Sequence, residues 1–313
     1  MVTHAAGIRF LKVAVLGVVA ANIVFYLLFL AFPPALGFCL TLAGRGPEGS
    51  AVEVGRALGR YRAMRNLEKE ALRASQIDEP GTNAFQLTKS QMGPFWEPAL
   101  NGGSAVVAQI AELQAKYRNF DRPAVNRGDI VLDCGANVGT FTRYALNAGA
   151  RVVVAIEPAP KNAECLRRNF GREIAAGGVI ICEKGVWDKE DVLVLKENEE
   201  TSAMDSFIRS EKTHPGVVVP LTTIDRLVEE LKLERVDFIK MDIEGAEQRA
   251  LRGGRATLAR CHPRLEISVN HLPEDPVMIP RIIREAWPGY RPEYLLCELK
   301  RDWRVAANIV FFR

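Results

Sequence analysis

Acidic residues and a histidine stand at the ends of apolar runs after residue 128 of this 313-residue chain. They are Asp133, Glu157, Glu183, Asp242 and His271. Carboxylates hold hydroxyl and ammonium groups of ligands, and both carboxylates and imidazoles transfer protons. If the apolar runs are parallel strands, their carboxyl ends meet at the edge where open α/β sheets bind ligands. The sequence therefore predicts a ligand site at that edge.

The first apolar run ends in an acid and a glycine-rich turn of the form D-x-G-x-x-x-G, which differs from the G-x-G-x-x-G of dinucleotide enzymes. An acid directly before the turn disfavours a pyrophosphate and suits a ligand with a cationic group. Alternatively, Asp133 is structural and accepts N–H bonds from the loop, and both roles can hold together. Glycines let the backbone turn sharply and approach a ligand. The loop residues expected to contact it are Gly135, Ala136, Asn137, Gly139 and Thr140.

The next two runs end in residues suited to a nucleoside. Glu157, followed by Pro158, comes about 20 residues after the loop, the spacing at which an acid holds ribose hydroxyls. The third run ends near Glu183 and Gly185, at an edge that would lie beside an adenine. Glu183 is expected to contact the ring and Gly185 to leave room for it, unless both are simple loop residues.

Three carboxylates follow the fourth run at a predicted strand-to-helix turn. Glu244 and Glu247 can be explained by the preference of acids for a helix N-terminus, whereas Asp242 stands at the strand tip itself. Asp242 and Glu244 could hold a cation, but nothing in the sequence completes an octahedral set around them, so no metal site is assigned. His271 directly follows the fifth run, at the same expected edge.

The elements that position these residues alternate along the chain. Strands are expected over 130–133, 152–156, 179–182, 236–241 and 265–269, with helices over 140–147, 161–170 and 246–251. Their continuous apolarity indicates strands covered on both faces, and hence a parallel sheet. Short strands are expected at 192–195 and 217–221, and an antiparallel end pair at 294–296 and 307–312. Thr222 with Asp225 suggests a capping box for a helix reaching residue 231. Residues 105–313 are thus predicted to form one doubly wound α/β domain.

Four phrases within residues 125–295, VLDCGANVGTFT, AIEP, IKMDIEGAE and LEISVNHLPEDPVMIP, together resemble the FkbM family of S-adenosylmethionine-dependent methyltransferases. The resemblance implies a class I methyltransferase fold, S-adenosylmethionine as methyl donor and a hydroxyl acceptor, often on a sugar or natural product. It assigns the methionine part of the donor to the glycine-rich loop and the ribose to Glu157. One departure is Asn270, where many relatives carry an aromatic residue before the histidine, and it concerns the acceptor contacts.

A hydroxyl is a weak nucleophile that benefits from a general base. His271 is the first candidate for this base and Asp242 the second, with Glu274 or Asp275 orienting the imidazole. The alternative for His271 is a structural role. The segment 196–220 is expected to help shape the acceptor pocket.

The N-terminal part of the chain suggests a membrane anchor. Residues 13–44 contain no charge, and the most apolar part, 13–32, has the roughly 20 residues that a helix needs to cross a ~30 Å hydrocarbon layer. Pro33 and Pro34 are expected to end this helix. The flanking arginines and lysines mildly favour a cytoplasmic C-terminal domain. A cleaved signal peptide and a buried core helix are the alternatives.

Residues 45–104 are expected to link this anchor (1–44) to the catalytic domain. An amphipathic helix is predicted over 50–77, which either self-associates or packs on the domain, and its arginines could meet anionic headgroups. The glycine- and proline-rich residues 78–104 suggest a connector. An anchored site meets lipid-linked acceptors at raised effective concentration, so a small-molecule or lipid-linked glycan acceptor near the membrane is expected.

Composition excludes several classes. A net charge of +3 is too small to argue for nucleic-acid binding. No pair of the six cysteines has C-x-x-C spacing, which argues against a zinc site or a disulfide framework. The rival hypothesis is a non-catalytic membrane-tethered scaffold that retains the fold, but the complete set of strand-end acids favours an enzyme. A nicotinamide-dependent oxidoreductase would need a glycine pattern that this chain lacks.

Overall fold

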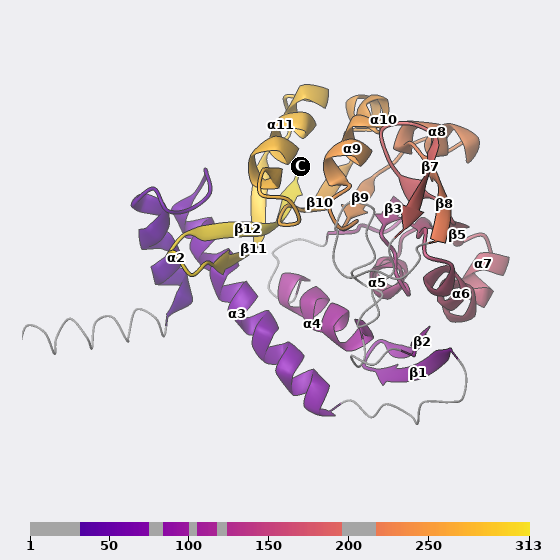
Figure 1. Ribbon diagram of the computed structural model, residues 1–313, viewed down its shortest axis with the longest axis horizontal. Coiled ribbons are helices and arrows are strands. Elements are labelled where there is room, and N and C mark those ends of the chain that lie inside the picture. Colours follow the sequence, from indigo (N-terminus) through magenta and orange to yellow (C-terminus); the bar gives the residue numbers. More distant parts are fainter. Residues whose placement is uncertain (1–31, 75–83, 100–104, 118–123, 196–216) are drawn as a thin grey trace, which may run out of the picture.

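The computed structural model describes residues 32–74, 84–99, 105–117, 124–195 and 217–313. Its centre is a seven-stranded sheet in the order β11-β12-β10-β9-β3-β4-β5 (Figure 1). All neighbouring pairs are parallel except those of β12, which is antiparallel to β10 and β11. The strands are β3 (Ile130–Cys134), β4 (Val152–Ile156), β5 (Val179–Cys182), β9 (Phe238–Met241), β10 (Arg264–Ser268), β11 (Pro292–Leu299) and β12 (Val305–Phe312). The predicted mostly parallel sheet with an antiparallel end pair is confirmed.

Helices cover both faces of this sheet, as continuous apolar strands require. Successive residues of β3 show the two sides: Val131 packs with Phe141 on one face, and Leu132 packs with Ile224 and Leu258 on the other. The first face is covered by α4 (Ala105–Tyr117), α5 (Thr140–Asn147) and α6 (Pro160–Asn169), which is followed by the short α7 (Gly171–Ala175). The second is covered by α8 (Ile224–Glu230), α9 (Glu247–Arg252), α10 (Arg255–Cys261) and α11 (Asp275–Ala286).

The cap of α8 differs from the predicted capping box by one residue. Thr223 is the N-cap, and its side chain accepts a hydrogen bond from the Arg226 N–H. Asp225 instead caps the next helix, α10, because its carboxylate accepts bonds from Ala256 N at 3.0 Å and Thr257 N at 2.7 Å. A pairing between two helices cannot be inferred from the local spacing on which a capping box depends.

Replacing Asp225 by alanine is expected to lower the free energy of unfolding by about 1–2 kcal/mol, because two N–H groups of α10 lose their acceptor. Glu229 on the same helix is the control, since its side chain is 73% exposed. Its replacement by alanine should change stability by no more than about 0.5 kcal/mol. Chemical denaturation of both variants measures the difference, and equal stabilities would contradict the capping role.

A small three-stranded sheet stands beside the carboxyl edge of the large one. Its order is β6-β8-β7, formed by β6 (Gly185–Val186), β8 (Val217–Thr222) and β7 (Asp191–Leu195). It includes the two short strands predicted there. Met204, Phe207 and His214, which the sequence places near the acceptor, lie outside the described residues.

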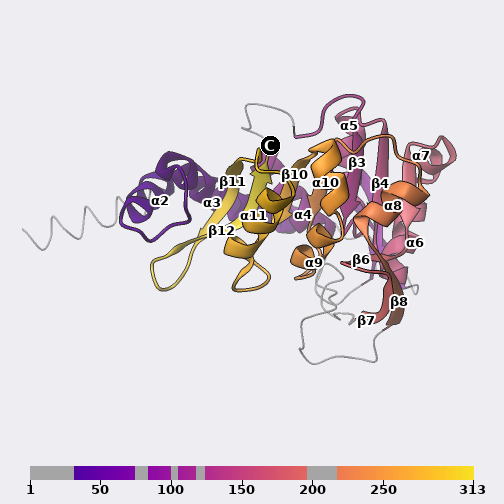
Figure 2. The same ribbon diagram turned by 90° about the horizontal axis from the view of Figure 1, so that it is seen from above.

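The N-terminal elements lie at the β11 end of the sheet, whereas α6 and α7 lie at the β5 end (Figure 2). They are α2 (Pro33–Leu42) and α3 (Ala51–Ala74). The predicted amphipathic helix is confirmed as α3, and it packs on the domain: Arg60 donates hydrogen bonds to the carbonyls of Tyr294 at 2.6 Å and Leu295 at 2.8 Å. Self-association through residues 50–77 stays a prediction.

The predicted connector contains a β-hairpin, β1 (Phe85–Ser90) and β2 (Gly93–Pro98). Its glycine and proline residues stand where a two-stranded ribbon accepts them: Gly93, with φ +97°, begins β2, and Pro98 ends it. The hairpin is held by Glu97, which is buried and accepts hydrogen bonds from Gln86 and Thr88. The proline and glycine content indicated a connector but did not indicate these two strands.

The predicted membrane helix, residues 13–32, falls outside the described residues apart from its last one. Among the helices that the structure does describe, none combines the length and the apolarity needed to cross a membrane. Pro33 takes the first position of α2, where a proline lacking an N–H is readily accommodated.

Candidate functional site

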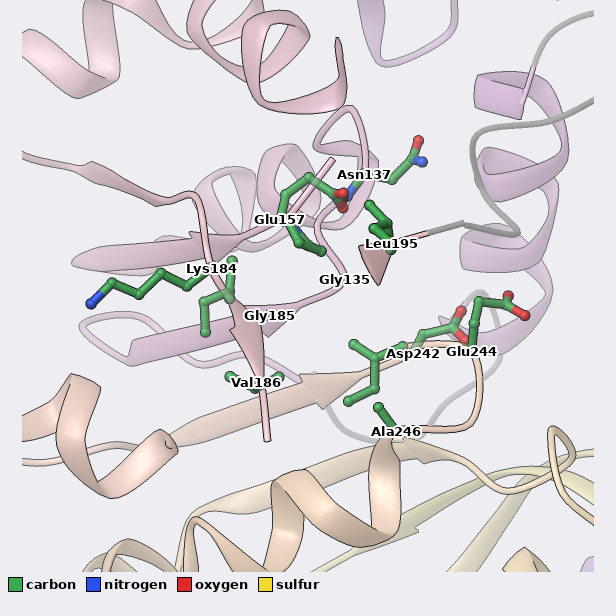
Figure 3. Close-up of a pocket in the computed structure, with 13 residues that line it drawn as sticks. Gly135, Asn137, Glu157, Lys184, Gly185, Val186, Leu195, Asp242, Glu244 and Ala246 are labelled. Atoms are coloured by element: carbon green, nitrogen blue, oxygen red, sulfur yellow. Dashed lines mark hydrogen bonds between the residues drawn. The ribbon is translucent and has the colours of Figure 1, made fainter. Parts of the chain in front are cut away.

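A cavity of about 530 Å³ opens at the carboxyl ends of β3, β4 and β9 (Figure 3). Its walls are Gly135, Asn137, Ile156, Glu157, Pro158, Lys184, Gly185, Val186, Leu195, Asp242, Ile243, Glu244 and Ala246. The structure thus brings together six of the predicted cofactor-binding residues: Gly135, Asn137, Glu157, Pro158, Gly185 and Asp242.

The glycine-rich turn has the sharp backbone that its sequence predicts. Gly135 and Gly139 have φ values of +76° and +94°. The N–H groups of Gly135 and Ala136 both donate to the Ile156 carbonyl, at 3.0 and 3.1 Å, so the turn is tied to the end of β4. Gly139 begins α5, and a Cβ there would lie 2.2 Å from the Phe170 ring. Gly139 therefore shapes the turn and lines neither of the two cavities described here.

Glu157 is buried at the cavity wall and is anchored to the turn. One carboxylate oxygen accepts the Asn137 N–H at 2.8 Å and the other accepts the Ala159 N–H at 2.9 Å. Burial raises the pKa of Glu157, and the hydrogen bonds oppose this shift without cancelling it. Each carboxylate oxygen can accept more than one hydrogen bond. Glu157 can therefore hold ligand hydroxyls while it stays fixed to the protein.

Asp133 contacts other protein groups, although the hydrogen bond to its carboxylate comes from a side chain instead of the loop N–H groups that the structural alternative expected. It is fully buried, accepts a hydrogen bond from the Thr142 hydroxyl at 2.7 Å and lines neither cavity. The Lys240 ammonium lies 3.5 Å from it and donates to the Gly135 carbonyl at 2.8 Å. The Lys240 ammonium thus offsets the charge of Asp133. These contacts indicate that Asp133 supports the loop, and they do not indicate that it selects a cationic ligand.

The structure separates the two residues that were predicted to lie beside the adenine at the end of β5. Gly185 lines the cavity, whereas Glu183 forms an ion pair with Arg167 and lines neither cavity. Apolar side chains complete this side, namely Ile156, Val186, Leu195 and Ile243. Figure 3 shows Leu195 reaching in from the end of β7. Such walls suit the flat face of a base.

A second, larger cavity of about 1100 Å³ adjoins the first. Its walls come from the predicted loop residues Ala136 and Thr140 and from helices α3 and α4, with Thr140 donating to Gln109 at 2.8 Å. Residues common to both cavities are Gly135, Asn137, Asp242 and Glu244. Asp242 therefore stands where the two spaces meet.

His271 lies behind this junction. Its side chain is 7% exposed, with Nδ1 2.8 Å from Glu247 Oε1 and Nε2 3.4 Å from Asp242 Oδ1 and 3.5 Å from Glu244 Oε1. The buried Glu247 also accepts the N–H groups of Ile243 and Gly245. Glu247 thus orients the imidazole.

The two residues predicted for that orienting role lie elsewhere. Asp275 accepts hydrogen bonds from Gln248 and from the Leu272 N–H, and Glu274 is exposed at the start of α11. Glu247 is the first residue of α9, which follows the turn after β9. Because β9 and β10 are neighbours in the sheet, Glu247 lies close to the residues that follow β10.

The charges around His271 favour its protonated form. Burial alone would lower the pKa of His271, but hydrogen bonds with Glu244 and Glu247 and the charges of Glu247 and Asp242 raise it to about 11. Burial would raise the pKa of Asp242, but Lys240 and His271 outweigh that effect and lower it. In this arrangement the imidazole is a cation and Asp242 an anion at neutral pH, so His271 must first lose its proton before it can act as a base.

Several cavity residues were missed from the sequence. Lys240 carried a signal, because a lysine inside a buried apolar strand needs a partner. Arg65, Gln109 and Lys116 line the larger cavity from α3 and α4 and match no motif. Arg65 lies on the helix predicted over 50–77, whereas no helix was predicted over α4, for which the apolar spacing was the available signal.

The strand order, the antiparallel β12 and the cavity at the carboxyl edge define a class I methyltransferase-type α/β fold. Residues 133–291 match the family model described as the methyltransferase FkbM domain, which covers about half of the chain. The chain belongs to the FkbM methyltransferase family, whose members are S-adenosylmethionine-dependent enzymes. The resemblance seen in the sequence is thereby confirmed.

Similar proteins include a methyltransferase, sdnD, of Sordaria araneosa, which is 26% identical over 164 residues covering 43% of this chain and 63% of the relative. The 31-O-demethyl-FK506 methyltransferase FkbM of Streptomyces tacrolimicus is 25% identical over 189 residues, covering 49% of this chain and 73% of the relative. The crystal structure of the methyltransferase FkbM from Methylobacillus flagellatus has a TM-score of 0.46 and 20% identity, covering 67% of this chain and 53% of that one. The chain thus spans less than two thirds of the first relative and of that solved structure.

Proposed function

We propose that this protein transfers a methyl group from S-adenosylmethionine to a hydroxyl group of a sugar, glycolipid or natural-product acceptor near a membrane. The observation that carries the proposal is the position of Glu157 and Asp242 on one cavity at the carboxyl edge of the sheet, with Asp242 also on the adjoining larger cavity. Two joined spaces suit a reaction between two ligands.

The smaller cavity fits the nucleoside part of the donor. Glu157 would hold the ribose hydroxyls, and Val186, Leu195 and Ile243 would cover the adenine. The loop residues Ala136 and Thr140 face the larger cavity, so they would contact the methionine part. When bound, S-adenosylmethionine supplies a methyl group on a positively charged sulfur that leaves as a neutral thioether.

Asp242 is the group best placed to meet the acceptor hydroxyl. Its side chain is 36% exposed, whereas His271 is 7% exposed behind it. Alignment of the two reactants supplies much of the rate enhancement when the leaving group is already good. We therefore assign to Asp242 the contact with the hydroxyl and to His271, held by Glu247, the support of that carboxylate.

The larger cavity supports a polar acceptor. Charged and amide side chains line it, namely Arg65, Glu68, Gln109, Glu112, Lys116 and Lys240. Such walls can donate to and accept from several hydroxyl groups. The Streptomyces relative is named for a 31-O-demethyl acceptor, which agrees with methyl transfer to oxygen.

The N-terminal elements support a membrane-proximal acceptor. Residues 13–32 have the length and apolarity of a membrane helix. Apolar side chains are exposed just before α2 and at its end, with Phe32 61% and Leu42 68% exposed. Arg65 on α3 lies roughly 20 Å along the helix axis from its start. The part of the larger cavity that α3 lines would thus be within reach of the polar head of a lipid-linked acceptor. Cleavage of the C-terminal domain by a protease added outside intact cells would contradict the cytoplasmic orientation.

The activity is tested with the full-length chain in detergent. Methyl-labelled S-adenosylmethionine is incubated with extracts of envelope lipids and glycans, and mass spectrometry seeks products heavier by one CH₂. Calorimetry with S-adenosylmethionine alone separates the enzyme from a non-catalytic scaffold. Absence of binding would favour the scaffold.

Replacing Glu157 by glutamine is expected to weaken S-adenosylmethionine binding by about 10–100-fold, because the amide turns a donor toward the Asn137 or Ala159 N–H and loses an acceptor for the ribose. Glu183→Gln is the matched comparison, since that carboxylate faces Arg167 instead of the cavity. It should bind the cofactor as the wild type does. Calorimetric titration measures both affinities. An equal loss of affinity in the two variants would show that Glu157 does not hold the ribose.

A further inference from the structure

We propose that Asp242, Glu244 and His271 bind one divalent transition-metal ion at the acceptor end of the site. Each residue offers one ligand atom, and the three atoms lie within 4.8 Å of one another. The binding site stands on these residues alone, whereas the role of the ion rests on the proposed function.

The separations fit a shared ion. His271 Nε2 lies 3.4 Å from Asp242 Oδ1 and 3.5 Å from Glu244 Oε1. Ligands about 2.1 Å from one ion lie roughly 3.0 Å apart at octahedral angles and roughly 3.4 Å apart at tetrahedral angles. The two separations from His271 Nε2 are therefore those expected of ligands that share one ion.

His271 is held in the orientation that a metal ligand needs. Its Nδ1 is 2.8 Å from Glu247, a fully buried carboxylate that two backbone N–H groups fix in turn. Nε2 is thereby directed at Asp242 and Glu244. A carboxylate on the second ring nitrogen is the usual partner of a metal-bound histidine, because it fixes the tautomer and raises the basicity of the ligand.

The cluster holds more carboxylates than bases, and a bound metal ion would take the place of the proton on His271. Three carboxylates, those of Asp242, Glu244 and Glu247, surround one imidazole. The nearby Lys240 ammonium is directed to the Gly135 carbonyl and Asp133. A mixed set of one imidazole and two carboxylates suits Mn²⁺, Fe²⁺ or Zn²⁺ better than Ca²⁺, which prefers oxygen alone.

The position of the cluster indicates what the ion would do. Asp242 and Glu244 border both cavities, so an ion held by these residues would be accessible from the larger one. An alcohol oxygen bound to a dication loses its proton more readily, and the proton can pass to water in that cavity. The ion would thus activate the hydroxyl that methyl transfer requires.

The test uses the full-length chain in detergent, stripped with EDTA and titrated with Mn²⁺ alone, with free Mn²⁺ measured by electron paramagnetic resonance. One Mn²⁺ per chain is expected. Asp242→Asn, Glu244→Gln and His271→Gln should each weaken binding at least about 10-fold, and Glu247→Gln should weaken it by about 10–100-fold through the loosened imidazole. Asp302→Asn, at a site 49% exposed in the loop between β11 and β12, should bind as the wild type does.

Circular dichroism of each variant separates unfolding from loss of a ligand. Absence of binding by the wild type up to about 1 mM Mn²⁺ would overturn the proposal. The cluster would then be an ion pair between a protonated His271 and its neighbouring carboxylates. Unchanged affinity in folded Asp242→Asn and His271→Gln would overturn the proposal as well. S-adenosylmethionine titrated into the stripped protein distinguishes the two proposals: binding of the cofactor without Mn²⁺ binding rejects the metal site alone, and Mn²⁺ binding without cofactor binding rejects the proposed function alone.

Discussion

Replacing Gly135 by alanine is expected to lower methyl transfer and S-adenosylmethionine binding by more than about 100-fold. Gly135 has φ +76°, and a Cβ there would lie 2.0 Å from the Asp242 carbonyl oxygen and 3.0 Å from its carbon. That backbone is fixed, because Asp242 N donates to the Cys134 carbonyl at 3.1 Å. The clash cannot be relieved by rotating a side chain, so the glycine-rich turn and the end of β9 must separate. Both walls of the cofactor cavity would move.

A matched control isolates the steric clash from the backbone strain. Gly177, which follows α7, has φ +75°, and a Cβ there would meet no atom within 4 Å. Gly177→Ala should therefore cost only the strain of a left-handed alanine, about 1–2 kcal/mol of stability, and leave cofactor affinity unchanged. Calorimetric titration and thermal unfolding of the two variants measure the contrast. Equal cofactor affinities would show that the close approach of Gly135 to Asp242 does not shape the site.

The central sheet could be predicted because its signals are local. The continuous apolar runs of β3, β4 and β5 are each bounded by a polar or glycine residue, and burial on both faces follows from that pattern. Carboxyl ends of parallel strands share one edge of the sheet whatever the strand order, which was not predicted. For the same reason Glu157 and Asp242 could be assigned to one edge before any distance was known.

The partners of the site residues could not be predicted, because they depend on contacts between strands. His271 is oriented by Glu247, 24 positions earlier, since β9 and β10 lie side by side. Lys240 is paired with Asp133 by the register of β9 against β3. In both cases the sequence shows charges at the correct edge but not which charge faces which. For this reason the sequence suggested Glu274 or Asp275 as the acid that orients His271, whereas Glu247 is the carboxylate in contact with Nδ1.

Lys116 is the charge whose removal should destabilise the protein most. It lies on α4 with its side chain 3% exposed, and its Nζ is 2.8 Å from Glu112 and 2.6 Å from Glu266, whose side chain is 2% exposed. Lys116→Met would leave the Glu266 carboxylate buried without a counter-charge. Breaking such a pair costs about 3–5 kcal/mol. Urea denaturation at neutral pH measures this loss.

The pH dependence of the variant provides a second readout. Burial already raises the pKa of Glu266, and Lys116 opposes that shift. Without the lysine the folded protein would hold a proton that the unfolded chain releases, so the stability of Lys116→Met should fall as pH rises from about 5 to 8 relative to the wild type. A parallel decline in both proteins would contradict the burial of an unpaired Glu266.

Two further variants decide whether the loss comes from the charge or from packing. Lys116→Met combined with Glu266→Gln removes both charges, so most of the lost stability should return. Arg151→Met breaks an ion pair with Glu234 whose side chains are 52% and 60% exposed, and it should cost less than about 1 kcal/mol. If the double variant is no more stable than Lys116→Met, the lysine stabilises α4 through the packing of its aliphatic stem, and the buried ion pair is not what holds α4 against the sheet.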